Sequence, residues 1–425
     1  MRARARHPFS RSGGVAAVVA AACFPAAAHA APDSEAPRGP AKPLPNLSAH
    51  FTQRSYLPGQ VATVSLRSKH RVLTLQVLRA GAERPWNSIG KPWGPPQTIR
   101  WNRTGRAAPL KVRVGDWSSG LYFLRITTRN RRVTYAPFVV RAPQPGSWSR
   151  VAVVLPTHTW QSYNHWDANQ DGTGDTWYAR QSIKSVNLQR PYINQGKPPY
   201  YRSYDRAFLR FLTHRGHRAE YLTEDDFDTF ASGDDLARLY DLIVFVGHHE
   251  YKTVKAFDLT ERYRDLGGNL AFLSANNFYW RVDLKQNRIW RIKKFRDLGR
   301  PEARLIGVQY RANDRGQRLG PYVVVDRGAA PWLFAGLPFE NGQPLGTVRY
   351  GIEFDMMTPD SPTGTVLLAE VNPAMADPTI RGHMTYYATP AGAKVFAAGT
   401  LGFGGSDNPV GHHLFTNLWA HLTQP

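Results

Sequence analysis

Three polar clusters directly follow apolar runs, and their residue types are suited to chemistry. They are THTWQSYN at 157–164, GHHEY at 247–251 and SANN at 274–277. Packing of a core does not require a carboxylate, histidines, phenols and amides at such places. Together these groups can hold a hard metal ion or carry out acid and base chemistry. The structural alternative is that the tyrosines pack at interfaces and that His248 and Glu250 cap the following helix.

The elements that must position these clusters are short strands alternating with helices. The runs at 151–155, 241–246 and 269–274 are apolar apart from polar residues at the ends of the last two, which is typical of parallel strands buried on both faces. Helical patterns at 205–215, ending at Gly216, and at 253–265 lie between them. This order predicts a Rossmann-like α/β domain over 147–425, mostly parallel, with helices on both faces of the sheet. Ligands of such sheets bind beyond the carboxyl ends of the strands, where the clusters stand.

The rest of the chain gives fewer signals. Strand-like runs between 300 and 400 are expected to decorate the same domain, which ends in a helix at 413–422. Short alternating runs between 48 and 142 predict a small Ig-like β-sandwich, since no helical stretch interrupts them. A Pro-rich segment at 142–146 is the expected linker, and 31–47 is the expected flexible leader.

The first 30 residues have the pattern of a secretory signal peptide. Four arginines precede a short apolar run, and small residues end at Ala30, where we expect cleavage. The single cysteine, Cys23, lies inside this segment, so the secreted protein would hold none. A lipoprotein anchor on Cys23 is the alternative. No later segment approaches the apolar length of a transmembrane span.

Composition bounds the class of protein. The chain has 425 residues, 42% apolar and 12% aromatic, which indicates a folded rather than a disordered protein. One cysteine excludes a disulfide scaffold and a thiolate metal site. The formal charge is +22. Because arginine occurs along the whole chain, we interpret this charge as composition, and the alternative partner is acidic or polysaccharide cell-wall material; no specific nucleic acid is expected.

Four short motifs carry a family resemblance. The strings TWQSYN, QRPY, GHHEY and NLAFLSANNFYWRV, in this order, resemble the C-terminal domain of the large (beta) subunit of N,N-dimethylformamidase and its relatives. The resemblance covers residues 150 to 420, and the preceding sandwich is similar to the small β domain that often comes before it. It implies a glutamine-amidotransferase-like domain that holds one ferric ion through two tyrosines and one glutamate.

Carried over position by position, the resemblance assigns the residues of the site. The iron ligands it implies are Tyr163, Tyr192 and Glu250. His248 and Asn276 would orient the substrate and the attacking water, and Glu353, ahead of Glu370, would act as a later acid. Three further tyrosines compete with Tyr192 as the second phenolate, namely Tyr200, Tyr201 and Tyr204.

The implied chemistry is coherent with these residue types. Two phenolates and a carboxylate are hard anionic donors that favour Fe(III), and open coordination positions would let the ion polarise an amide carbonyl and acidify water. The implied activity is that of a secreted amidohydrolase that cleaves non-peptide carbon–nitrogen bonds of small amides; an oligomer is compatible with it, and the oligomeric state and the need for a small partner subunit stay open. Gln189, His249 and Lys252 depart from the family pattern, which leaves the substrate open.

A second metal is predicted by the segment DANQDGTGD. Oxygen donors stand at positions 1, 3, 5 and 9 of a calcium loop, and Gly172 stands at position 6. Tyr178 occupies position 12, where an acidic residue is usual, so a solvated turn is the alternative. The Ca²⁺ ligands predicted by this spacing are Asp167, Asn169, Asp171 and Asp175.

Crowded aromatic residues suggest the main non-catalytic alternative. Stacked aromatic rings bind sugar rings as well as they line an apolar pocket. The protein would then be a carbohydrate or cell-wall binding protein on an amidotransferase-like fold. The aromatic residues concerned are Trp160, Trp166, Trp177, Tyr178, Tyr200 and Tyr201.

Overall fold

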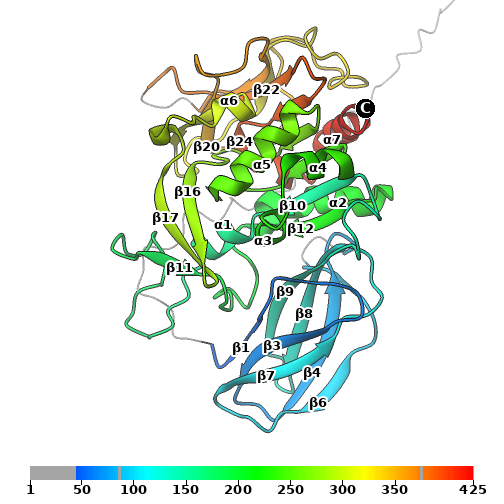
Figure 1. Cartoon of the computed structure of the whole chain (residues 1–425), viewed down its shortest axis with the longest axis vertical. Helices are drawn as coiled ribbons and strands as arrows, with labels where there is room; N and C mark the ends of the chain where they lie inside the picture. Colours follow the sequence, from blue (N-terminus) through cyan, green and yellow to red (C-terminus); the bar gives the residue numbers. More distant parts are fainter. Residues whose placement is uncertain (1–44, 85–87, 374–376, 425) are drawn as a thin grey trace, which may run out of the picture. The chain divides into compact units, whose positions relative to one another are not determined.

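The computed structural model of the chain describes residues 45–84, 88–373 and 377–424 (Figure 1). The predicted signal peptide and most of the predicted leader lie outside the described residues. All described residues belong to one unit that spans 32–425. The domain boundaries at 142 and 147 therefore stay predictions.

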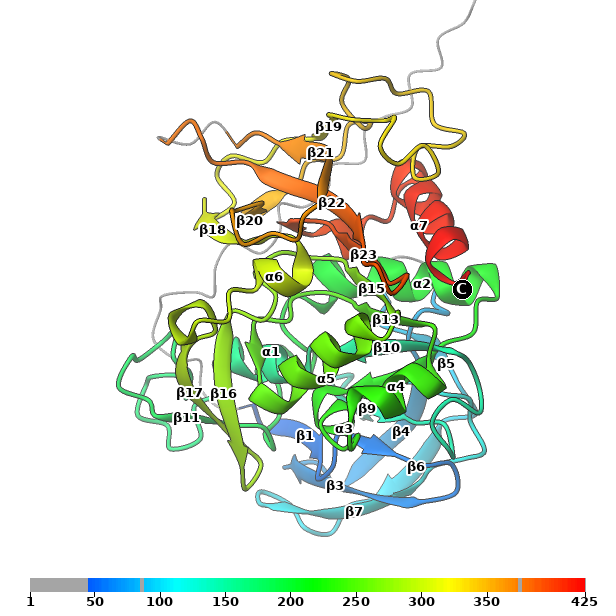
Figure 2. The ribbon, with the colours of Figure 1, turned by 45° about the horizontal axis from the view of Figure 1, so that its top comes forward.

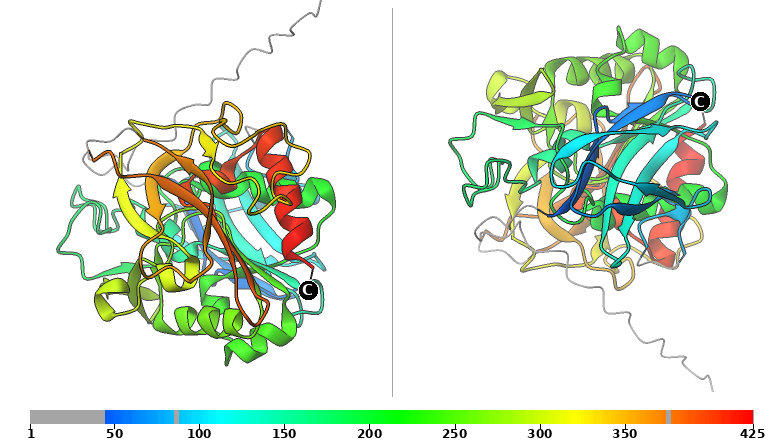
Figure 3. Two further views of the ribbon diagram at one scale, coloured as in Figure 1. Left: turned by 90° about the horizontal axis from the view of Figure 1, so that it is seen from above. Right: turned by 90° about the horizontal axis from the view of Figure 1, so that it is seen from below.

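Alternating apolar residues form two sheets between residues 47 and 140. One sheet has the order β1 (Leu47–Phe51), β3 (Val61–Ser68) and β7 (Ala107–Arg113). The other has the order β2 (Ser55–Tyr56), β9 (Val133–Val140), β8 (Gly120–Thr128), β4 (Val72–Arg79) and β5 (Lys91–Pro92), with β6 (Gln97–Arg100) beside β4. Every second residue of β3 is buried, and Val64 packs in one core with Tyr122 and Phe138 of the other sheet. The strands are seen from below in Figure 3.

An eight-stranded sheet forms the centre of the second half of the chain. Its order is β12 (Glu220–Thr223), β10 (Val151–Leu155), β13 (Leu242–Phe245), β15 (Asn269–Phe272), β23 (Lys394–Ala397), β22 (Gly382–Ala388), β21 (Val366–Val371) and β19 (Tyr322–Val324). The first five strands of this order, from β12 to β23, run parallel to one another. The pairings of β23 with β22, of β22 with β21 and of β21 with β19 are antiparallel. Figure 2 shows β22 and β21 continuing the sheet beyond β23.

The prediction of a mostly parallel, three-layer Rossmann-like fold is wrong. Strands make up 33% of the structure and helices 18%, in several mixed and antiparallel sheets. The apolar runs that suggested a parallel sheet do lie side by side, as β10, β13 and β15. Beyond residue 280 the strands alternate polar and apolar residues, a pattern that in the sequence suggested short strands on the surface of the domain. Several of these strands instead pair antiparallel and extend the central sheet.

Helices are short, and most begin at a side-chain cap. They are α1 (Thr157–Ser162), α2 (Arg206–Arg215), α3 (Glu224–Phe227), α4 (Gly233–Leu239), α5 (Val254–Asp265), α6 (Ala303–Ile306) and α7 (Pro409–Leu422). The Thr253 hydroxyl accepts the Ala256 amide and begins α5, while Gly216 with φ +70° ends α2, as the sequence predicts. None of the helices within the described ranges is long and apolar enough to cross a membrane.

Two small sheets bring distant segments to the rim of the central sheet. One has the order β11 (Ser185–Asn187), β17 (Arg288–Lys294), β16 (Trp280–Lys285) and β14 (Tyr251–Lys252). The other has the order β18 (Gln309–Asn313), β20 (Gly351–Met356) and β24 (Thr400–Leu401). Strand β14 begins directly after Glu250, and β20 carries Glu353, so both sheets contribute to the same region.

The three acidic residues of α3, at positions 224–226, contact two different parts of the chain. Its Thr223 cap and the Asp226 side chain form a capping box that fixes the helix start. Glu224 is buried among side chains of the second half of the chain, whereas Asp225 forms an ion pair with Arg54 of the first half. The carboxylate of Asp226 also accepts a hydrogen bond from Ser55 Oγ at 2.6 Å. Three consecutive acids thus join the two halves.

Candidate active site

The three polar clusters meet at one rim because their strands are neighbours. Strand β10 leads into α1, at whose end Tyr163 stands, and β13 leads into Gly247, which precedes His248. Gly247 has φ +72°, and a Cβ there would lie 1.9 Å from Asp205 Oδ1, so only glycine permits this turn. The carboxyl end of β15 adds the cluster that contains Asn276.

Two phenols converge on one carboxylate oxygen. The Tyr163 hydroxyl donates to Glu250 Oε2 at 2.9 Å, and the Tyr178 hydroxyl donates to the same oxygen at 2.8 Å. The two phenol rings stack with their centroids 4.1 Å apart. Tyr251 contacts the Tyr178 hydroxyl at 2.7 Å, and it is the donor, because the Tyr178 proton is already given to Glu250. Four oxygens therefore gather in one place.

His248 links this cluster to a second carboxylate. Its Nε2 lies 3.2 Å from Glu353 Oε2 and 3.7 Å from Glu250 Oε2, and all three side chains are at least 90% buried. Asn313 Nδ2 donates to the other oxygen of Glu353 at 3.1 Å. The imidazole is thus placed between two carboxylates, where it can accept or release a proton.

Asn276 lies beside a carboxyl group that the sequence analysis did not assign. The Asn276 backbone amide donates to both oxygens of Asp355, at 2.8 and 2.9 Å. Burial, with a smaller contribution from the nearby Glu353, raises the pKa of Asp355 to about 8, although the hydrogen bonds from the Asn276 amide lower it. The side-chain Oδ1 of Asn276 is buried and has no hydrogen-bond partner among the described residues. Asp355 stands two residues after Glu353 on β20, a spacing that places both on one face.

Burial shapes the acidity of the whole cluster. It raises the pKa of Glu250, which His248 lowers and Glu353 raises again. It also raises the pKa of Tyr163 and Tyr178 well above the phenol value, and the Glu250 charge adds to both. Although burial opposes it, the Glu353 carboxylate raises the pKa of His248. The site therefore holds more acidic groups than its own cations can balance.

Tyr192 does not take part in this convergence. It is buried, and burial raises its pKa, which Arg54, Arg190 and a hydrogen bond with Gln161 lower. No hydrogen bond or ring contact within the described residues joins it to Glu250, so its role as a ligand stays a prediction. Tyr178 stands at the carboxylate instead, delivered by a loop whose position no periodic pattern in the sequence reveals.

Two of the three alternative tyrosines lie beside the site. The Tyr200 ring packs edge-on against Tyr163 at 5.6 Å and stacks on Tyr204 at 5.2 Å. Tyr204 in turn lies 6.5 Å from the His248 ring. Tyr201 points elsewhere and contacts the Phe123 ring at 5.5 Å. The wall of the site is thus aromatic on this side.

The predicted calcium loop binds its own backbone. Both oxygens of Asp167 accept amides of the loop, from Asp171 at 3.3 Å and Gly172 at 2.9 Å. Asp175 Oδ2 accepts the Ala168 amide at 2.9 Å, and Asp171 forms an exposed ion pair with Arg180. No group of three His, Cys, Asp or Glu side chains in the described ranges is arranged for a metal. Calcium at this loop, with Asn169 as the fourth donor, stays a prediction.

Two of the three departures from the family pattern, His249 and Lys252, meet in one buried network. Lys252 Nζ donates to Glu224 Oε1 at 2.7 Å and to His249 Nδ1 at 3.0 Å. His249 Nε2 lies 3.1 Å from the Val154 carbonyl, so Nε2 carries the proton and Nδ1 accepts. The other oxygen of Glu224 accepts the His158 amide at 2.6 Å. This network anchors the loop that carries Glu250 from both sides.

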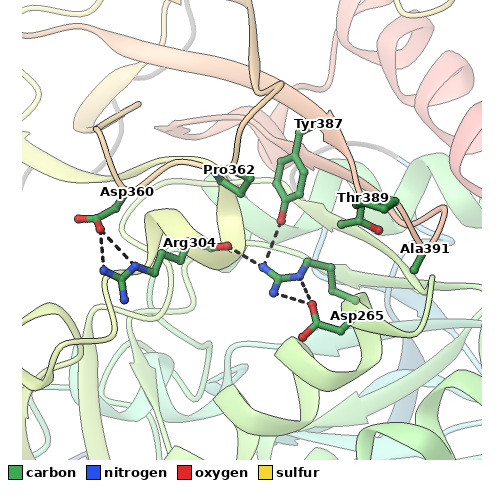
Figure 4. A pocket seen from close by; sticks show the side chains of 9 residues that line it. Asp265, Arg304, Asp360, Pro362, Tyr387, Thr389 and Ala391 are labelled. Atoms are coloured by element: carbon green, nitrogen blue, oxygen red, sulfur yellow. Dashed lines mark hydrogen bonds and ion pairs between the residues drawn. The ribbon is translucent and has the colours of Figure 1, made fainter.

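A wide surface depression elsewhere is not the catalytic site. It is lined by Arg264, Arg304 and Tyr387 among others, and its guanidinium groups are already paired (Figure 4). Arg304 binds Asp360 at 2.9 Å, and Arg264 binds Asp265 at 2.6 Å. Because each charged side chain that lines the depression is paired with another one there, it lacks the buried, unpaired acidic groups found around Glu250 and Glu353.

Comparison with known proteins shows a family match over the part of the chain that contains this rim. The family described as N,N-dimethylformamidase beta subunit-like, C-terminal matches residues 96–407. The chain is 26% identical over 165 residues to the N,N-dimethylformamidase beta subunit of Paracoccus aminophilus, covering 37% of the chain and 20% of the relative. It is 22% identical over 308 residues to that of Alcaligenes sp., covering 57% and 38%. The chain thus spans less than half the length of these relatives.

Solved structures add little. A superoxide reductase (neelaredoxin) from Ignicoccus hospitalis aligns with a TM-score of 0.16 and 11% identity, over 22% of this chain and 79% of that one. A cycloisomaltooligosaccharide glucanotransferase from Paenibacillus sp. aligns with a TM-score of 0.17 and 8% identity, over 54% and 44%. Neither likeness indicates a shared fold. The family match covers most of the chain, including all four motifs, and on that ground the chain belongs to the N,N-dimethylformamidase beta subunit-like, C-terminal family.

Proposed function

We propose that the chain hydrolyses small amides at a centre with one ferric ion held by Tyr163, Tyr178 and Glu250. The observation that carries the proposal is the convergence of two phenol hydroxyls on Glu250 Oε2, at 2.9 and 2.8 Å, in a buried place. Tyr178 takes the role that the sequence assigns to Tyr192. Family membership supports the class of reaction.

The side chains present fit such an ion. Burial raises the pKa of Glu250 and of both phenols, so a bound cation would favour the deprotonated forms that act as ligands. Three hard anionic oxygens would balance a trivalent ion, and such donors favour Fe(III) over metals that prefer thiolates. When bound, the ion would supply Lewis acidity toward an amide carbonyl and toward water.

The neighbouring side chains supply proton transfer and orientation. His248 Nε2, between Glu250 and Glu353, is placed to take a proton from water and to return it to the departing amine. The buried Oδ1 of Asn276, which has no partner among the described residues, can accept a hydrogen bond from the substrate N–H or from the attacking water. In the net reaction the carbon–nitrogen bond breaks, the acyl carbon gains the hydroxyl group of water, and the nitrogen gains the proton.

Export is a separate part of the proposal. It is supported by the basic start, the apolar run and the small residues before Ala30 in the sequence. N-terminal sequencing of the protein from the culture medium tests it, and a start near residue 31 is the expected result.

Iron analysis of three matched variants tests the centre. The purified chain should hold about one iron per molecule with a phenolate-to-iron absorption band. Glu250→Ala should lose the iron, and Tyr178→Phe should lose most of the band, whereas Tyr192→Phe should keep both. Loss in Tyr192→Phe with retention in Tyr178→Phe would reverse the assignment, and a chain without iron that still cleaves N,N-dimethylformamide would refute the centre.

The non-catalytic alternative finds less support in the structure. Trp160, Trp166, Trp177 and Tyr201, which suggested a sugar-stacking surface, are all at least 90% buried. Tyr178 is 39% exposed, but its hydroxyl end is turned inward to Glu250. These aromatic rings form walls and core rather than an open platform.

A further inference from the structure

The positive charge of the chain is concentrated in residues 45–141, which form the two β-sheets and are called the first half here, with residues 142–425 as the second half. Residues 45–141 contain seventeen Lys and Arg but only two Asp and Glu, so this segment accounts for +15 of the total of +22. Residues 142–425 contain thirty-one Lys and Arg and twenty-eight Asp and Glu, which leaves them close to neutral. The charge is therefore a property of the two β-sheets and not of the whole chain.

Strand register gathers much of this charge at one end of the sheets. Leu73 pairs with Thr128, and Val72 pairs with Arg100, so the connections after β3, β6 and β8 end side by side. The Trp101 amide donates to the Arg71 carbonyl at 2.7 Å, which joins two of these connections directly. We name residues 67–71, 100–106 and 129–132 the basic turn end; its cations are Arg67, Lys69, Arg71, Arg100, Arg103, Arg106, Arg129, Arg131 and Arg132.

The cations of the basic turn end have no carboxylate partners. All of them except Arg67 are exposed, and none forms an ion pair within the described residues. Several exposed arginines elsewhere are paired with carboxylates, as Arg150 with Asp241 at 2.6 Å and Arg262 with Asp234 at 2.8 Å. Nine clustered cations that repel one another are costly unless an outside anion balances them.

The two acids of the segment cannot provide that balance. Glu83 is fully buried, and its Oε1 accepts the Arg206 guanidinium at 2.7 Å. Asp116 is exposed but stands in the connection from β7 to β8, and the pairing of Val61 with Arg113 places this connection at the opposite end of the strands. The basic turn end is thus uniformly positive.

We propose that the basic turn end binds a linear anionic polysaccharide. Eight of its nine cations are arginines, whose planar forks match carboxylate, sulfate and phosphate oxygens. Single-stranded nucleic acid would need aromatic rings on which bases stack. The large apolar side chains exposed on the described part of these sheets are Val61 and Val72, and neither is aromatic. Recognition by repeated charge, without stacking, favours the polysaccharide.

The experiment measures binding of the full chain to heparin, polygalacturonate, uncharged dextran and duplex DNA at about 0.05 and 0.2 M salt. We expect binding to both anionic polysaccharides that weakens steeply with salt, and none to dextran. A triple variant with Arg103→Ser, Arg106→Ser and Arg129→Ser should bind at least about tenfold more weakly and show a shallower salt dependence.

A charge-matched triple variant controls for bulk electrostatics. Arg215→Ser, Lys255→Ser and Lys285→Ser remove the same charge from exposed positions in the second half of the chain, and binding should change less than about twofold. Equal losses in the two variants, no binding by the wild type, or tighter binding of duplex DNA would each overturn the proposal. Both variants should keep the thermal midpoint and the amide hydrolysis of the wild type. A chain without hydrolase activity would refute the function proposed above and leave this test unaffected.

Discussion

The hydroxyl of Tyr178 lies 2.8 Å from Glu250 Oε2, although 72 positions separate the two residues. Tyr178 closes the loop whose acidic residues bind their own backbone amides, at the position where a calcium ligand is usual. The loop therefore has a clear structural task with or without calcium, because it brings a phenol to the carboxylate.

Removal of the imidazole should impair catalysis without emptying the centre. In His248→Gln we expect kcat to fall by about 10² to 10⁴, the usual contribution of a proton-transfer group, because Nε2 lies between Glu250 and Glu353. Iron content and thermal midpoint should stay at wild-type values. Parallel measurements of kcat, KM and iron check this, and an unchanged kcat would exclude His248 from the reaction.

Breaking the buried network should destabilise the fold. Lys252 is 1% exposed, and Lys252→Met leaves the Glu224 carboxylate without its cation. Breaking a buried pair in this way costs about 3 to 5 kcal/mol. Urea unfolding measures the change in the free energy of unfolding. The control is Arg262→Ala, whose pair with Asp234 is about half exposed and screened by solvent, and there we expect no measurable change in the free energy of unfolding.

The glycine before His248 should tolerate no side chain. Gly247→Ala places a Cβ against Asp205 Oδ1 and adds strain at φ +72°, so we expect loss of activity and lower stability. The matched control is Gly216→Ala, since Gly216 has φ +70° but open space around its Cβ. That variant should lose only about 1 kcal/mol of stability and keep its activity. Similar behaviour of the two variants would show that contact with Asp205 is unimportant.

Acidification should destabilise the chain through His383. Burial lowers the pKa of His383 from 6.5 to about 4, and its Nδ1 accepts the Met357 amide. Between these pH values the unfolded chain binds a proton that the folded chain does not, so stability falls as the pH falls from 6.5 toward 4. His383→Asn can still accept a hydrogen bond but does not titrate in this range. The free energy of unfolding, measured by urea titration across the pH range, should decline less in the variant, by on the order of 2 kcal/mol.

The sequence predicts parts of this arrangement for physical reasons. Continuous apolar runs indicate β10, β13 and β15, and parallel neighbours bring Tyr163, His248 and Asn276 to one rim. The antiparallel strands after residue 280 were missed as sheet members, because half-polar alternation does not distinguish an extension of a sheet from surface decoration.

Other features depend on pairing that the sequence does not display. Tyr178 lies in a loop without periodicity, so nothing local predicts that it, and not Tyr192, reaches Glu250. The clustering of the cations in the basic turn end cannot be predicted locally either, since they are spread over more than sixty positions and only the strand register brings them together. Asp355 stands only two residues after Glu353 in the sequence, yet its contact with the Asn276 amide requires the fold.

The acidic turn of α3 makes the chain hard to divide. A cut near residue 142 would strip Arg54 from Asp225 and Ser55 from Asp226, and would leave two carboxylates next to Glu224 without these partners. Their mutual repulsion would then act on the same short helix that holds Lys252 and, through it, the loop of Glu250. A truncated chain that keeps only residues 142–425 should therefore carry amides in place of those two acids, or else the sheets that neutralise them should be retained.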